Sequence, residues 1–214
     1  MNVRLLPARP PAALIAPIVR VLAAAGVTPT MLTAAGLIGN IGGAALVIEG
    51  APLAAGIVVL LASALDMLDG ALARATGSAS RFGAMFDSVL DRLSEAVVLF
   101  GIAWYAIDHG SREQALLAFA AVVGSLMVSY VRARAEGLNL QLRDGIFTRS
   151  ERVVLVGAML ITGYLRAGLW LLAVMSIFTA LQRLWIASNM LLAEDAAPRP
   201  PKPATSVAKA EPPR

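Results

Sequence analysis

The 214-residue chain contains no cysteine and one histidine, its only lysines are Lys202 and Lys209, and charged residues make up just 15% of it. Without cysteine there can be no disulfide framework, no thiolate metal site and no thiol nucleophile. The low charge accompanies a hydrophobic content of 58% and a mean hydropathy of +0.73, which soluble domains of this length rarely reach. The composition therefore indicates an integral membrane protein.

The formal net charge of +4 comes almost wholly from arginine, and the arginines gather at the ends of apolar segments. In a soluble protein such a balance could indicate a nucleic-acid partner. At membrane boundaries it is better explained by topology and by an anionic substrate. We therefore expect membrane lipids, and no nucleic acid, among the partners.

Six apolar segments approach the roughly 20 residues that a helix needs to cross a bilayer. They are 31–48, 52–74, 83–107, 114–135, 150–166 and 168–191. A further short helix over 11–25 is expected to lie in the interface with its arginines among the headgroups, and Thr28-Pro29-Thr30 indicates the start of the next helix. The predicted fold class is an all-α integral membrane protein with six transmembrane helices and an N-terminal interfacial helix.

The chain divides into an N-terminal cytoplasmic segment (1–30), a six-helix transmembrane domain (31–193) and a tail (194–214) that is predicted to be disordered. One set of loops is rich in arginine, whereas the opposite set holds only Arg112 and Arg166. The rich set contains Arg74, Arg81, Arg132, Arg134, Arg143, Arg149 and Arg152. The positive-inside rule therefore predicts a multi-pass protein of the cell membrane with both termini in the cytoplasm.

Four carboxylates interrupt the second and third apolar segments. Asp66 and Asp69 are three residues apart, and Asp87 and Asp91 are four apart, so each pair shares one face of its helix. A hairpin that turns at 75–82 would bring the two faces together in the cytoplasmic half of the membrane. A charged side chain at membrane depth costs roughly 3 kcal/mol or more, so four of them require a compensating cation.

Oxygen ligands of this kind suit Mg²⁺, Mn²⁺ or Ca²⁺, and the lack of cysteine and of nearby histidine argues against zinc. Mg²⁺ is expected because of its availability, with Mn²⁺ as an alternative. Four carboxylates exceed what one Mg²⁺ usually takes from a protein, which leaves room for two ions bridged by substrate oxygens. Structural ion pairs with Arg74, Arg81 and Arg92 are the alternative explanation. The full spacing D-x2-D-G-x2-A-R-x8-G-x3-D-x3-D, from Asp66 to Asp91, fixes eight positions and makes chance a poor account.

This stretch resembles the signature of the CDP-alcohol phosphotransferases, integral membrane enzymes of phospholipid synthesis, at every signature position. The resemblance implies transfer of a phosphoryl group from a CDP-linked lipid to an acceptor hydroxyl, with release of CMP. It assigns Asp66, Asp69, Asp87 and Asp91 to a pair of metal ions, with Asp91 also the general base. Contacts to the CDP-lipid would come from Pro29, Thr30, Asp66, Gly70, Arg74 and Ser80. Family resemblance also implies a homodimer.

The acceptor is indicated by sequence around and beyond this signature. Asp87-Ser88-Val89-Leu90-Asp91-Arg92 resembles the subgroup that transfers to inositol phosphate and makes phosphatidylinositol phosphate from a CDP-diacylglycerol-type donor. The second half of the chain also resembles this subgroup. Its arginines would suit an acceptor that bears a phosphate, because a guanidinium group binds phosphate bidentately. The residues assigned to the acceptor phosphate are Arg132, Arg134, Arg152 and Arg183.

Three alternatives stay open at this point. Arg132, Arg134, Arg149 and Arg152 could be positive-inside anchors that extend to the headgroups. The acceptor could be glycerol 3-phosphate, which would make the chain a phosphatidylglycerol-phosphate synthase. In a different class, the acids could line the pathway of a cation channel or transporter, although Gly70, Ala73 and Arg74 have no evident role there.

Overall fold

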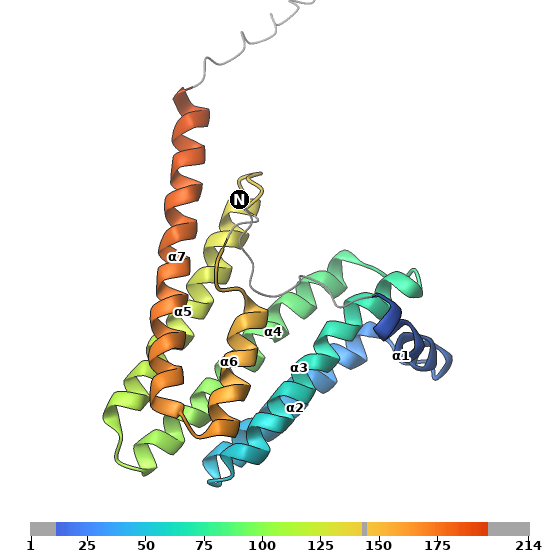
Figure 1. Ribbon diagram of the computed structural model, residues 1–214. Coiled ribbons are helices and arrows are strands. Elements are labelled where there is room, and N and C mark those ends of the chain that lie inside the picture. The colour runs from blue at the N-terminus through green and yellow to red at the C-terminus, as the bar shows by residue number, and fades with distance from the viewer. Residues whose placement is uncertain (1–11, 143–144, 197–214) are drawn as a thin grey trace, which may run out of the picture.

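The computed structural model describes residues 12–142 and 145–196, and within them every element is a helix (Figure 1). The bounds are α1 Ala12–Ala24, α2 Pro29–Ile48, α3 Pro52–Ala75, α4 Arg81–Asp108, α5 Arg112–Glu136, α6 Arg149–Thr162 and α7 Leu165–Ala196. The all-α prediction is therefore confirmed for this part of the chain. Arg143, the residues before 12 and the lysines of the tail lie outside it.

Local sequence signals explain where the helices start and stop. The Thr28 side chain accepts a hydrogen bond from the Met31 N–H at 3.3 Å, and Pro29 occupies the first turn of α2, as the sequence predicts. Ser80 caps α4 in the same way through the Gly83 N–H. At the other end of α6, Gly163 takes the left-handed conformation (φ 77°), so this helix stops after 14 residues. The predicted fifth span, 150–166, is therefore too long at its C-terminal end.

Among the described residues, four helices (α2, α3, α5 and α7) are by length and composition apolar enough to cross a membrane. The other two predicted spans also form helices but differ in character. The first half of α4 carries Asp87, Asp91, Arg92 and Glu95, and α6 is short. Charged residues therefore lower the hydropathy of α4, whereas α6 is short because the backbone turns at Gly163.

Helices α1, α2 and α3 form one packed group, and α5 and α7 form a second; α4 and α6 each contact both groups. Helix α2 lies against α3 and α4, α3 lies against α6, α4 lies against α5, and α5 lies beside α7. Figure 1 shows α2 and α3 running together with α1 at one end of the pair, while α7, the longest helix, runs along α5. Val19 of α1 joins a small core with Leu32 and Leu72, which fixes α1 against α2 and α3.

Small residues allow α2 and α3 to approach closely. A Cβ added at Gly39 would lie 2.7 Å from the Ala62 Cβ, and one at Gly43 would lie 2.6 Å from a Val59 methyl carbon. The sequence-based expectation that Gly39 and Gly43 permit close helix packing is confirmed. At the C-terminal end, α7 continues to Ala196, so helix replaces the first three residues of the tail predicted from 194.

Candidate active site

The structure brings the four predicted carboxylates into one cluster near the turn between α3 and α4. Asp66 and Asp69 on α3 are buried, and Asp87 and Asp91 on α4 are half-buried. Asp87 interacts directly with Asp69, and Asp91 lies within electrostatic range of both Asp87 and Asp66. Four carboxylates this close repel one another, so their convergence indicates a site built to hold positive charge.

The cluster is divided into two pairs. Asp69 and Asp87 face an open cavity, whereas Asp66 and Asp91 both contact Arg149, the first residue of α6. The Arg149 guanidinium lies 3.0 Å from Asp66 Oδ2 and 2.9 Å from Asp91 Oδ1. In the described residues, no three acidic or histidine side chains surround one point at metal-binding distance. Arg149 is the cation between the second pair.

Each buried carboxylate is oriented by the helix beside it. The Thr33 hydroxyl of α2 donates to Asp69 Oδ2 at 2.6 Å, and the Gly70 N–H donates to the other oxygen of Asp69. Asp66 points at Gly36 of α2, where an added Cβ would overlap the carboxylate. Helix α2 therefore shapes the site in two ways: Thr33 donates a hydrogen bond to Asp69, and Gly36 leaves room for the Asp66 carboxylate.

These residues fit a divalent cation on two observations. Asp66 Oδ1 is buried and has no hydrogen-bond partner among the described residues, so it has an unused acceptor that a bound cation would satisfy. The oxygen-only donor set also suits Mg²⁺ or Mn²⁺ rather than zinc. The residues that would hold such ions are the four aspartates.

A cavity of about 530 Å³ opens beside Asp69 and Asp87. Its walls come from the link between α1 and α2, the second half of α3 and the loop that leads into α4. Five of the six residues predicted to contact the CDP-lipid line it: Pro29, Thr30, Gly70, Arg74 and Ser80. Asp66, the sixth, is not part of the lining and lies with Arg149 instead. The volume suits a nucleotide-sized ligand with the carboxylates at one edge.

The four arginines predicted for the acceptor phosphate do not meet at one point. Arg132 and Arg134 are exposed on the last turns of α5, where Arg132 pairs with Glu136 at 2.8 Å. Arg152 is buried against Glu95, and the buried Arg183 donates to the Val128 carbonyl at 2.8 Å. Arg149, by contrast, contacts the carboxylates directly. The sequence contained one indication of a role for Arg149: the spacing Arg149-x2-Arg152 puts both arginines on one helix face.

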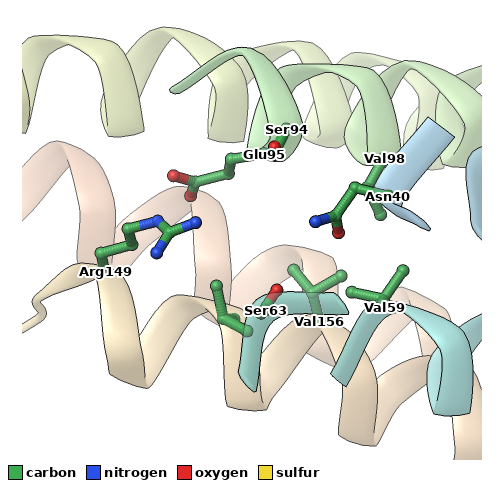
Figure 2. A pocket seen from close by; sticks show the side chains of 9 residues that line it. Asn40, Val59, Ser63, Ser94, Glu95, Val98, Arg149 and Val156 are labelled. Carbon is green, nitrogen blue, oxygen red and sulfur yellow. The ribbon is translucent and has the colours of Figure 1, made fainter. Parts of the chain in front are cut away.

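Glu95 is the second residue that the motif did not point to. Its carboxylate accepts from Arg152 Nε at 2.6 Å, from Arg152 Nη2 at 2.9 Å and from the Ser125 hydroxyl at 2.8 Å. Figure 2 shows Glu95 of α4 and Arg149 of α6 directed into the same space, with Asn40 and Ser63 nearby. Glu95 follows Asp91 by four residues, so it extends the acidic face of α4 by one turn.

Comparison with known proteins identifies relatives that span most of the chain. A family model described as CDP-alcohol phosphatidyltransferase matches residues 26–182, a range that includes all four carboxylates. The archaetidylinositol phosphate synthase of Pyrococcus horikoshii is 38% identical over 173 residues, or 80% of this chain and 89% of that protein. The phosphatidylinositol phosphate synthase of Mycobacterium tuberculosis is 36% identical over 183 residues, or 78% and 82%.

Solved structures show that the membrane fold is shared as well. The crystal structure of the Mycobacterium tuberculosis phosphatidylinositol phosphate synthase with CDP-DAG bound matches with a TM-score of 0.76 at 35% identity, and covers 82% of this chain and 94% of that one. The same enzyme in complex with manganese and citrate matches with a TM-score of 0.74 at 35% identity, over 80% and 88%. The similarity therefore extends through both fold and sequence.

Proposed function

The chain is an enzyme of the CDP-alcohol phosphatidyltransferase family, and from this premise we propose its donor and its acceptor. It transfers the phosphatidyl group of CDP-diacylglycerol to a hydroxyl of inositol phosphate, which yields phosphatidylinositol phosphate and CMP. The observation that carries the proposal is the cavity lined by Arg74 and Ser80, with Asp69 and Asp87 at its edge. Family membership sets aside the channel and transporter alternative.

On the donor side, the cavity residues Pro29, Thr30, Gly70, Arg74 and Ser80 bind the CDP group. Asp66, the sixth predicted contact, lies outside the cavity lining and would meet the CDP-lipid from the Arg149 side. Arg74 is exposed in the last turn of α3, where its guanidinium can pair with a phosphate oxygen. Gly70 has no side chain, which leaves room beside it for the Arg74 guanidinium; an added Cβ would lie 3.3 Å from Arg74 Nη1. A CDP-DAG-bound relative with this fold supports the assignment.

At the reacting phosphorus, Asp91 acts as general base. The acceptor oxygen forms a bond to the phosphatidyl phosphorus while the bond from that phosphorus to CMP breaks, and the hydroxyl proton passes to Asp91. Two Mg²⁺ ions, or Mn²⁺, held by Asp66, Asp69, Asp87 and Asp91 would neutralise the pyrophosphate and stabilise charge on the departing CMP. The manganese complex of the mycobacterial relative supports a divalent metal.

On the acceptor side, Arg149 of α6 binds the phosphate of inositol phosphate, and the arginines predicted for this role surround it on α5, α6 and α7 without meeting at one point. The predicted set is Arg132, Arg134, Arg152 and Arg183, and the structure gives reason to add Arg149. Arg149 lies 2.9 Å from the proposed base, so a phosphate held by it would bring the sugar hydroxyl close to Asp91. Relatives named for inositol phosphate lipids support this acceptor over glycerol 3-phosphate.

The enzyme would cross the membrane six times, as α2 to α7, with the site open to the cytoplasm. Helix α6 is about 21 Å long at 1.5 Å per residue, which is shorter than the roughly 30 Å hydrocarbon core. Its charged first turn would therefore lie below the headgroups, inside a cleft that water and a phosphorylated sugar can enter. We also propose a homodimer and an interfacial position for α1.

The test is CMP release by the detergent-solubilised protein with CDP-diacylglycerol and Mg²⁺. Separate reactions contain inositol 3-phosphate, glycerol 3-phosphate, free inositol or no acceptor. Release that requires inositol 3-phosphate is the expected result. Release with glycerol 3-phosphate alone would contradict the acceptor, and silence with every acceptor would contradict the donor. In the last case an archaetidyl donor is the next substrate, because one relative is an archaetidylinositol phosphate synthase.

A further inference from the structure

Two ion pairs, one turn apart, connect α4 to the start of α6. The first joins Asp91 to Arg149 at 2.9 Å, and the second joins Glu95 to Arg152 at 2.6 Å. The two acids are four residues apart and the two arginines are three apart, so each set lies on one face of its helix. The pairs therefore form two parallel rungs between the same two helix faces.

The two rungs differ in how free they are to exchange partners. Arg149 is 27% exposed and is shared between Asp91 and Asp66, whereas the Arg152 side chain is 2% exposed. Arg152 makes two parallel bonds to Glu95, and its third nitrogen lies 3.4 Å from the Phe147 carbonyl. A bidentate pair without water holds one geometry, while an exposed arginine between two acids can turn toward a ligand.

Glu95 is also tied to a third helix, because the Ser125 hydroxyl of α5 donates to it at 2.8 Å. Toward α6, its carboxylate lies within electrostatic range of Arg149, and both side chains line one small cavity of about 10 Å³ (Figure 2). That space is too small for a substrate. Glu95 therefore has the surroundings of a group that holds other residues in place.

We propose that Glu95 is a positioning residue for the acceptor side of the active site. It anchors Arg152, which fixes the first turn of α6 and thereby keeps Arg149 against Asp91 and Asp66. The inference rests on the proposed function, because it assumes that Arg149 meets a phosphorylated acceptor. It predicts that loss of Glu95 impairs use of the acceptor much more than use of the CDP-lipid, whose cavity lies on the other side of the carboxylates.

The kinetic test uses Glu95→Gln, which keeps the shape of the side chain and removes its charge. The KM for inositol 3-phosphate is expected to rise at least about tenfold, while the KM for CDP-diacylglycerol stays within about twofold. Glu113→Gln is the matched control, because this exposed residue pairs with Arg166 at the opposite end of the helices. Equal changes in both KM values would overturn the proposal.

A double-mutant cycle tests whether Glu95 acts through Arg152. If it does, Glu95→Gln adds little to the acceptor KM of an Arg152→Gln protein, whereas independent roles would multiply the two effects and refute the mechanism. Ser125→Ala is a milder variant for use if the others fold poorly. It removes only the hydroxyl that donates to Glu95, and it should raise the acceptor KM about threefold.

A spin label on α6 tests the structural step without any acceptor. Because the chain has no cysteine, Ser150→Cys gives a single attachment point at an exposed position beside Arg149. The label is expected to become more mobile in Glu95→Gln and to stay unchanged in Glu113→Gln. Unchanged mobility in Glu95→Gln would overturn the proposal. If wild type instead fails to use inositol 3-phosphate, the proposed function fails while this measurement still reports on Glu95.

Discussion

Asp91 is the residue that we propose as the general base. It shares Arg149 with Asp66. Asp91→Asn is expected to lower kcat by about 10²–10⁴-fold, since an amide cannot take the proton of the attacking hydroxyl. CDP-diacylglycerol should still raise the melting temperature of the variant. An Asp91→Asn enzyme with full transfer activity would exclude this residue as the base.

Gly36 is a second position where one atom matters. An added Cβ would overlap the Asp66 carboxylate, so Gly36→Ala must displace either the helix or the acid. We expect a loss of about 1–3 kcal/mol in stability and a higher Mg²⁺ requirement, measured by thermal unfolding and by metal titration of activity.

Gly42→Ala is the matched control for that substitution, because Gly42 lies on the same helix with no atom within 4 Å of an added Cβ. It should be neutral or slightly stabilising. If the two alanine variants behaved alike, the inferred contact between Gly36 and Asp66 would be wrong.

At the scale of helices, the lengths of the apolar segments predicted the helix bounds closely. The expected span 52–74 compares with Pro52–Ala75, and 31–48 compares with Pro29–Ile48. The fifth span was predicted too long because its apolar sequence continues past Gly163, whereas the backbone turns there. Hydropathy responds to side chains and cannot register a left-handed glycine.

In the site, residues joined by a local motif could be predicted, whereas residues that meet only in the folded chain could not. Asp66, Asp69, Asp87 and Asp91 could be predicted from sequence because their spacing forms a motif within two adjacent helices. The meeting of Glu95 and Arg152 depends on where the surrounding helices place α4 and α6, and these residues are 57 positions apart. Only the four-residue step from Asp91 to Glu95 hinted that the acidic face continued.

The start of α6 provides an element-scale prediction. Glu151 accepts from the Thr148 N–H at 2.9 Å and also from the Thr148 hydroxyl, which fixes the turn that carries Arg149. Thr148→Ala is expected to cost about 1 kcal/mol and to raise the acceptor KM more than the donor KM. Unfolding and initial-rate measurements check this.

Thr162→Ala serves as the comparison, since Thr162 is exposed at the far end of the same helix and donates only to the Ala158 carbonyl. It should leave both KM values unchanged. Equal effects of the two threonine substitutions would show that the first turn of α6 has no special connection to the acceptor.

Over the whole molecule, the carboxylate cluster lies where two groups of helices meet. The link between α1 and α2, helices α2 and α3 and the start of α4 line the cavity assigned to the CDP-lipid, while α5, α6 and α7 carry the arginines assigned to the acceptor. Arg149 crosses this boundary by contacting acids of both α3 and α4. Under the proposed assignment, this arrangement would keep the two phosphate-bearing substrates on opposite sides of the carboxylates until their reacting atoms meet.

The orientation of the protein in the membrane can be tested with single cysteines, because the chain contains none. Ser78→Cys lies in the loop between α3 and α4 and lines the large cavity, whereas Asp108→Cys lies at the opposite end of α4. An impermeant maleimide should label Cys at 78 only in inverted vesicles and Cys at 108 only in right-side-out vesicles. CDP-diacylglycerol should protect position 78 and leave position 108 reactive. Labelling of both positions from one side would contradict the topology, whereas correct sidedness without protection would place the CDP-lipid outside this cavity.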